Sequence, residues 1–200
     1  MTDDDLARER RAMVEQQLRA RDIRDERILT AMAAVPRERF VDERARPFAY
    51  DDGPLPIGRE QTISQPYVVA LMLELAAPGA HERVLEVGAG SGYVVAVAAQ
   101  LAREVVGIER HADLARAAQD RLADLGVANA RVVAGDGTTG LPDEAPFDAI
   151  VVSAGAGQIP DALTSQLAVG GRLVVPHLVV DRGGPGLQVL ERIVREPDGG

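Results

Sequence analysis

The chain has 200 residues and a formal net charge of −9, from 31 acidic and 22 basic side chains. Hydrophobic residues make up 46% of the chain and charged residues 26%, which is typical of a folded globular protein and excludes a disordered one. The sequence has no cysteine, and every basic residue is an arginine. This excludes disulfides, thiol nucleophiles, Schiff-base lysines and the lysine of a P-loop.

Charge and hydropathy also narrow the expected partners and location. An acidic chain is poorly suited to nucleic acid, which is bound by clustered basic side chains. No apolar run approaches the ~20 residues that a membrane-spanning helix needs, and the first five residues are acidic where a signal peptide is basic. We therefore expect a cytoplasmic protein, acting as a monomer, with no nucleic-acid or membrane partner.

The beginning of the chain is expected to be a helical extension. Residues 3–21 place apolar side chains at helical spacing, and Asp25 is a suitable N-cap for a second helix. The stretch Arg46–Gly58 is rich in Pro and Gly and is typical of turns or a linker. We accordingly expect an N-terminal helical extension over residues 1–50 and a main domain over residues 51–200.

In the main domain, short apolar strands alternate with helices. The expected strands are Val84–Val87, Val105–Ile108, Arg131–Ala134, Ala149–Val152, Leu173–Val175 and Gln188–Val194. The expected helices are Val68–Ala77, Ser91–Ala102, Ala112–Leu125 and Asp161–Ala168. This alternation predicts an α/β, Rossmann-like fold whose mostly parallel sheet has helices on both faces. A turn at 197–199 follows the last strand, and we expect the C-terminal tail beyond it to be short or truncated.

A glycine-rich loop joins the first of these strands to its helix. Residues 84–93 read V-L-E-V-G-A-G-S-G-Y, and glycines at such a turn allow a ligand to approach the main chain closely. A dinucleotide-binding loop would need glycine at position 93, where this chain has Tyr93. Glu86, inside the strand, would repel a pyrophosphate but suits a ligand with an ammonium group.

Further acidic residues follow the next two strands. Glu109 ends the second strand, where an acid typically accepts hydrogen bonds from ribose hydroxyls, and Asp136-Gly137 follows the third, where it would flank an adenine. Each acid alone is adequately explained as a solvated strand end. Together with Glu86, they predict partners for ammonium, ribose and adenine at one edge of the sheet, and so predict S-adenosylmethionine as the cofactor.

A second loop, Gln61–Tyr67, reads Q-T-I-S-Q-P-Y and precedes an apolar helix. Two roles are open to Ser64. It is a suitable N-cap, with Pro66 in the first helical turn, and it is also placed to present its hydroxyl and the local N–H groups to an anion.

With these motifs the chain resembles the bacterial protein-L-isoaspartate O-methyltransferases, a family of class I methyltransferases, over roughly residues 13–176. The glycine loop is common to class I methyltransferases, whereas the T-I-S-Q-P loop and the P-L-P-I-G motif at 54–58 are typical of this family. The resemblance implies protein repair. The α-carboxyl of L-isoaspartyl residues in damaged proteins and peptides would be methylated, and S-adenosylhomocysteine would be the product.

The resemblance also implies residue roles. Ser64 would be the catalytic residue beside the substrate carboxylate, with no metal. The implied cofactor-binding residues are Gln61, Thr62, Ile63, Ser64, Glu86, Gly88, Gly90, Gly92, Glu109, Asp136 and Gly137. The implied substrate-binding residues are Ile63, Ser64 and Val69. A carboxylate acceptor, with a pKa near ~3.5, is ionised at neutral pH and needs no strong base.

The chain departs from the family pattern in two segments, Ser153–Gln158 and Pro176–Leu178; His177, in the second, is expected to be a surface or strand-end residue. Two alternatives stay open, the first because of the Ser153–Gln158 departure and the short C-terminal tail. One is a carboxyl methyltransferase of the same fold that acts on a dedicated peptide Asp or a small carboxylate. The other is a non-catalytic subunit that binds S-adenosylmethionine. A nucleic-acid methyltransferase is disfavoured by the charge of −9.

Overall fold

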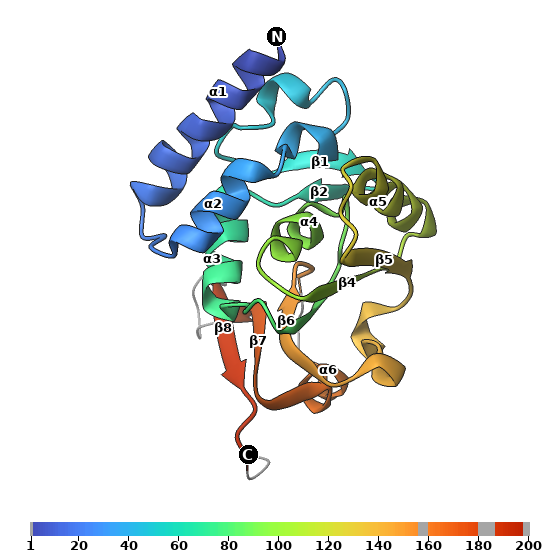
Figure 1. The fold of residues 1–200 in the computed structure, drawn as a ribbon. Coiled ribbons are helices and arrows are strands. Elements are labelled where there is room, and N and C mark those ends of the chain that lie inside the picture. Colours follow the sequence, from blue (N-terminus) through green and yellow to red (C-terminus); the bar gives the residue numbers. More distant parts are fainter. Residues whose placement is uncertain (1, 156–159, 180–186, 198–200) are drawn as a thin grey trace.

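The computed structural model describes residues 2–155, 160–179 and 187–197. At its centre is a six-stranded sheet in the order β5-β4-β3-β6-β7-β8 (Figure 1). Neighbouring strands are parallel except for β8, which runs antiparallel to β7. The strands are β3 (Arg83–Val87), β4 (Glu104–Glu109), β5 (Ala130–Ala134), β6 (Phe147–Val152), β7 (Leu167–Val179) and β8 (Leu187–Val194).

Helices connect and cover these strands. The α-helices are α1 (Asp3–Met13), α2 (Glu26–Ala34), α3 (Pro66–Ala76), α4 (Tyr93–Ala99), α5 (Ala112–Asp124) and α6 (Asp161–Ser165). A π-helix spans Val14–Arg19, and 3-10 helices span Arg37–Phe40, Arg46–Phe48, Gly137–Thr139 and Pro142–Glu144. A separate antiparallel hairpin consists of β1 (Leu55–Gly58) and β2 (Gln61–Ile63). Within the described ranges, none of these helices is long and apolar enough to cross a membrane.

Both faces of the sheet are buried in apolar clusters. Alternate residues of each strand point to opposite sides, so each strand contributes to both clusters. Val84 and Val105 belong to an apolar cluster that contains the buried sides of α3, α4 and α5. Leu85 and Val106 belong to a second cluster, which contains Leu163 of α6. The expected Rossmann-like fold, with a mostly parallel sheet and helices on both faces, is therefore confirmed.

The N-terminal helices pack on the same core as the main sheet. Leu6 of α1, Leu18 of the π-helix and Met32 of α2 are buried in the cluster that contains Val84, and α2 lies beside α3 (Figure 1). Asp25 caps α2 as expected, with its side chain accepting a hydrogen bond from an N–H of the first turn. The division of the chain at residue 50 stays a prediction.

Several expected boundaries are wrong. Ser64 is not the N-cap of α3: Gln65 occupies that position, and Pro66 is the first helical residue. The expected single helix over residues 3–21 becomes π-helical after Met13. The expected helix Asp161–Ala168 ends at Ser165, because the next side chain, Gln166, is buried and bonded to main-chain atoms elsewhere.

Other expectations shift or remain outside the structure. The Pro- and Gly-rich stretch expected to be turns contains strand β1 at its end. The helix expected from Ser91 begins only at Tyr93, because Gly92 has a left-handed φ of 87°. The expected turn at 197–199 lies mostly outside the described residues, as does the second half of the departure expected over Ser153–Gln158.

Candidate active site

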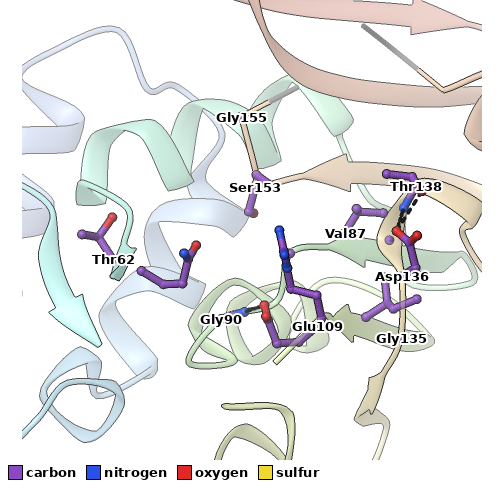
Figure 2. A pocket seen from close by; sticks show the side chains of 15 residues that line it. Thr62, Val87, Gly90, Glu109, Gly135, Asp136, Thr138, Ser153 and Gly155 are labelled. Carbon is purple, nitrogen blue, oxygen red and sulfur yellow. Dashed lines mark hydrogen bonds between the residues drawn. The ribbon is translucent and has the colours of Figure 1, made fainter. Parts of the chain in front are cut away.

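A cavity of about 640 Å³ lies at the carboxyl ends of β3, β4, β5 and β6. It adjoins a smaller cavity that shares part of its lining and reaches Ser64. Ligands bind at this edge in open α/β sheets, and the volume is in the usual range for a cofactor pocket. Figure 2 shows side chains from the separate strands around this space. The larger cavity is lined by Gln61, Thr62, Val87, Gly88, Gly90, Ile108, Glu109, Arg110, Gly135, Asp136, Gly137, Thr138, Ser153, Ala154 and Gly155.

Glu86 is the most completely buried acid of the site. It lies in the middle of the sheet, paired with Gly107 of β4 and Val151 of β6, and is 1% exposed. The hydroxyl of Ser153 donates a hydrogen bond of 2.8 Å to its Oε1, whereas its Oε2 is buried without a partner among the described residues. Burial raises the pKa of Glu86 to about 8, against the opposing effect of the Ser153 hydrogen bond.

Glu109 attaches the glycine loop to the end of β4. Its Oε2 accepts a hydrogen bond of 2.9 Å from the N–H of Gly90, and its Oε1 accepts one of 2.9 Å from the N–H of His111. Each carboxylate oxygen has two acceptor sites, so Glu109 still has room for donors from a ligand. It lines the larger cavity.

Asp136 begins a short 3-10 helix at the end of β5. Its Oδ1 accepts hydrogen bonds from the main-chain N–H and the hydroxyl of Thr138, at 2.9 and 2.8 Å (Figure 2). The main-chain hydrogen bond is the largest cause that lowers the pKa of Asp136 below its ordinary value. The next residue, Gly137, has no room for a side chain, because a Cβ there would lie 2.6 Å from Cγ1 of Val87.

The glycines of the loop have two different structural roles. Gly88 and Gly90 line both cavities and have φ angles of 84° and 52°, which glycine adopts readily and L side chains rarely do. Gly92 lines neither cavity. It packs against α5, where a Cβ would lie 3.1 Å from that of Ala118.

The Gln61–Ser64 segment forms one wall of the site. Gln61 and Thr62 line the larger cavity, whereas Thr62, Ile63 and Ser64 line the smaller one together with Glu86. The carbonyl oxygen of Ser64 accepts a hydrogen bond of 2.8 Å from Arg37. Thus the structure brings Ser64 and Glu86, 22 positions apart in the sequence, to the same small space.

Two residues named in the sequence analysis, Val69 and His177, lie outside the lining of both cavities. Val69 is fully buried in α3 and lines neither cavity. His177 lies within β7, half-buried, and also lines neither cavity.

The structure adds residues that the sequence analysis did not assign to the site. Ser153, Arg110 and Thr138 line the larger cavity. A usable signal was present for each, since each comes directly after a predicted strand end or within two residues of a predicted site acid.

These residues fit S-adenosylmethionine. The unpartnered oxygen of Glu86 is a suitable acceptor for an ammonium group, because a buried polar atom without a hydrogen-bond partner is costly. The free acceptor sites of Glu109 suit ribose hydroxyls, and the bare main chain at Gly137 suits the flat edge of an adenine.

Comparison with known proteins decides the family. A family model described as protein-L-isoaspartate(D-aspartate) O-methyltransferase matches residues 8–200. The chain belongs to this family. A protein-L-isoaspartate O-methyltransferase 1 of Rhodopseudomonas palustris is 56% identical over 171 residues, which are 86% of this chain and 70% of that protein. A protein-L-isoaspartate O-methyltransferase of Methylorubrum populi is 56% identical over 191 residues, 96% of this chain and 86% of that protein.

Solved structures of isoaspartyl methyltransferases have the same fold. One protein-L-isoaspartate O-methyltransferase superposes with a TM-score of 0.80 at 28% identity, over 94% of this chain and 60% of that chain. A putative one from Plasmodium falciparum, in complex with S-adenosyl-L-homocysteine, superposes with a TM-score of 0.75 at 24% identity, over 92% of this chain and 94% of that chain.

Membership of the isoaspartyl methyltransferase family confirms the expected activity and cofactor. The chain is an S-adenosylmethionine-dependent methyltransferase of L-isoaspartyl residues in proteins. This result favours the repair reaction over the alternatives of a dedicated carboxyl acceptor or a non-catalytic subunit.

Proposed function

We propose that this chain performs isoaspartyl methylation with Glu86 as the ammonium-binding residue and Ser64 as the catalytic residue at the acceptor carboxylate. The observation that carries the proposal is the buried Oε2 of Glu86, which has no partner within the described residues and lines the same small cavity as Ser64. Burial disfavours the ionised form of this carboxyl, and an ammonium group there would stabilise the ionised form.

The remaining cofactor contacts are proposed from the same geometry. Glu109 would accept hydrogen bonds from the ribose hydroxyls in addition to the one from the Gly90 N–H. Asp136 and Gly137 would flank the adenine. Gln61, Thr62, Ile63 and Gly88 would form the walls. Gly92 would act indirectly, by allowing α4 and α5 to pack closely.

The chemical step asks little of the protein beyond alignment. When bound, S-adenosylmethionine supplies a methyl group that is already activated by its sulfonium. The acceptor carboxylate is ionised at neutral pH, so no side chain has to remove a proton. Ser64 would donate a hydrogen bond that holds this carboxylate in line with the methyl group, and the buried walls would exclude water. Such alignment contributes up to ~7–11 kcal/mol in favourable cases.

The wider assignments are proposals of the same kind. Isoaspartyl proteins and peptides would be the partners, bound by a monomer without nucleic acid or membrane. The charge of −9 supports the absence of nucleic acid among the partners. A cytoplasmic location stays a proposal.

Substitution of Ser64 by Ala tests the proposed catalytic role. We expect Ser64→Ala to lower kcat on an isoaspartyl peptide and to leave the Kd of S-adenosylhomocysteine close to that of the wild type. The matched control is Ser165→Ala, at an exposed serine of α6 whose hydroxyl bonds to the carbonyl of Ala162 in the same helix. Equal losses of turnover and cofactor affinity in Ser64→Ala would assign Ser64 a structural role instead.

A further inference from the structure

Arg37 is a buried cation outside the set of residues that the sequence pointed to. It lies in the 3-10 helix Arg37–Phe40, between α2 and β1, and is 0% exposed. None of the ion pairs in the described part of the chain involves it. Its neighbour Glu38 accepts a hydrogen bond from the hydroxyl of Tyr50 instead.

The guanidinium group of Arg37 joins three separate segments. Its Nε donates a hydrogen bond of 2.8 Å to the carbonyl of Ala49, and its Nη2 donates one of 2.8 Å to the carbonyl of Ser64. Its Cζ lies 5.0 Å from the centre of the Tyr93 ring, within the range of a cation–π contact. Tyr93 is the first residue of α4, directly after the glycine loop.

This arrangement connects the glycine loop with the Gln61–Ser64 segment. The Tyr93 side chain is fully buried and packs edge-on against Phe40, with ring centroids 5.4 Å apart. Arg37 therefore contacts the beginning of α4 through the Tyr93 ring and bonds to the main chain of Ser64. A shift of this guanidinium would rotate the peptide unit that follows Ser64, and with it the direction of the Ser64 side chain.

The charge of Arg37 has a second consequence. Burial of the guanidinium lowers its pKa below the ordinary value, but arginine remains charged in proteins. The site also contains the buried carboxyl groups of Glu86 and Glu109, and Arg110 and Asp136 line its larger cavity. The acceptor itself is an anion. A buried cation directly behind Ser64 attracts such an acceptor, with little screening by water.

We propose that Arg37 is a positioning residue for methyl transfer: it fixes the Ser64 main chain relative to the glycine loop and places a positive charge behind the acceptor carboxylate. The inference rests on the proposed function of Ser64. It concerns the acceptor side of the reaction, so it predicts an effect on the peptide substrate that is separate from cofactor binding.

The test compares Arg37→Met and Arg37→Lys with the wild type. We expect Arg37→Met to raise KM for an isoaspartyl peptide and to lower kcat, with a combined loss in kcat/KM of about 100-fold, as for other small misplacements of reacting groups. Arg37→Lys keeps the charge but has no planar fork to bridge two carbonyls, so it should restore KM more than kcat. The Kd of S-adenosylhomocysteine should stay close to the wild-type value in both.

A matched control is Arg172→Met. Arg172 is also largely buried and bonds to the carbonyls of Ala76 and Ala77. Neither arginine lines a site cavity, but Arg37 bonds to Ser64, which does, whereas none of the bonding partners of Arg172 lines either cavity. We expect this variant to lower Tm with unchanged kinetic constants. A wild-type kcat/KM in Arg37→Met, equal losses of peptide and cofactor affinity, or the same kinetic loss in Arg172→Met would each overturn the proposal.

A measurement on the wild type covers the case in which Arg37→Met does not fold. In the complex with S-adenosylhomocysteine, addition of an isoaspartyl peptide should shift the guanidinium NMR signals of Arg37 and leave those of Arg172 in place. Unmoved Arg37 signals at saturating peptide would overturn the proposal. An inactive wild type would refute the proposed function itself. An active wild type whose Arg37 signals do not respond to the peptide would refute only this inference.

Discussion

Ser153 donates a hydrogen bond of 2.8 Å to one carboxyl oxygen of Glu86 and leaves the other oxygen buried with no partner among the described residues. The two residues come from adjacent parallel strands, Glu86 from within β3 and Ser153 from directly after β6. The pair thus presents an oriented acceptor to the space where the ammonium group of the cofactor would lie.

Replacement of Glu86 by Gln should weaken cofactor binding selectively. A hydrogen bond to a charged group is worth about 2 kcal/mol, so we expect the Kd of S-adenosylhomocysteine to rise roughly 30-fold. Isothermal calorimetry measures this directly. Asp124→Asn, at an exposed acid of α5, removes the same charge from the surface and should leave Kd unchanged. Similar Kd values for Glu86→Gln and the wild type would contradict the assignment of Glu86.

Cofactor binding should release a proton near neutral pH. Burial raises the pKa of Glu86 to about 8, so the carboxyl is protonated in the ligand-free protein below that pH. A bound ammonium group favours the ionised form, so binding expels the proton and affinity increases as the pH rises toward 8. Calorimetry at pH ~7 in buffers of different ionisation enthalpy should show this release in the wild type and a smaller release in Glu86→Gln.

The same group should make the ligand-free protein less stable as the pH rises. The pKa of Glu86 is raised from an ordinary value of 4.5 to about 8, so between these values the unfolded chain loses the proton first. This lowers the free energy of unfolding by at most about 1.4 kcal/mol per pH unit. In urea unfolding, Glu86→Gln should therefore gain stability relative to the wild type between about pH 5.5 and about pH 7.5. A constant difference across that interval would show that the carboxyl is ionised when folded.

Removal of the Ser153 hydroxyl should act through Glu86. The hydroxyl lowers the pKa of Glu86, so Ser153→Ala should raise that pKa further and extend the pH dependence of cofactor affinity to higher pH. At neutral pH the affinity should fall by less than in Glu86→Gln. In the double variant Ser153→Ala/Glu86→Gln, the serine substitution should have little additional effect. Fully additive effects of the two substitutions on Kd would argue against the coupling.

A methyl group at position 137 should block the cofactor pocket. In Gly137→Ala the new Cβ would lie 2.6 Å from Cγ1 of Val87, so the segment after β5 would have to move. We expect weaker S-adenosylhomocysteine binding and a lower Tm. Gly53→Ala is the matched control, because a Cβ there meets nothing within 4 Å. If Gly137→Ala binds as tightly as Gly53→Ala, the adenine does not lie against this segment.

The sheet and one edge of the site were predictable from sequence because both depend on local pattern. Runs of apolar residues define the strands, and carboxyl ends of parallel strands meet at one edge, which is where Glu109 and Asp136 line a common cavity. The ends of the helices were harder to predict from the sequence. The end of α6 depends on Gln166, whose side chain bonds to Thr139 and Leu141, far away in the chain.

The contacts that were not predictable join segments with no shared pattern. Arg37 and Ser64 are 27 positions apart, and Ser153 and Glu86 are 67 apart. Both contacts depend on how helices and loops pack on the finished sheet. In the sequence, Tyr93 only indicated the absence of a dinucleotide-binding glycine, whereas in the structure its ring supports the guanidinium of Arg37.

The most direct test of this account is methyl transfer from labelled S-adenosylmethionine to two matched peptides, one with L-isoaspartate and the other with L-aspartate at the same position. The account predicts that only the isoaspartyl peptide is labelled, and that isoaspartyl peptides of varied flanking sequence are also accepted. Labelling of the aspartyl peptide alone, or cofactor binding without transfer to either peptide, would contradict it.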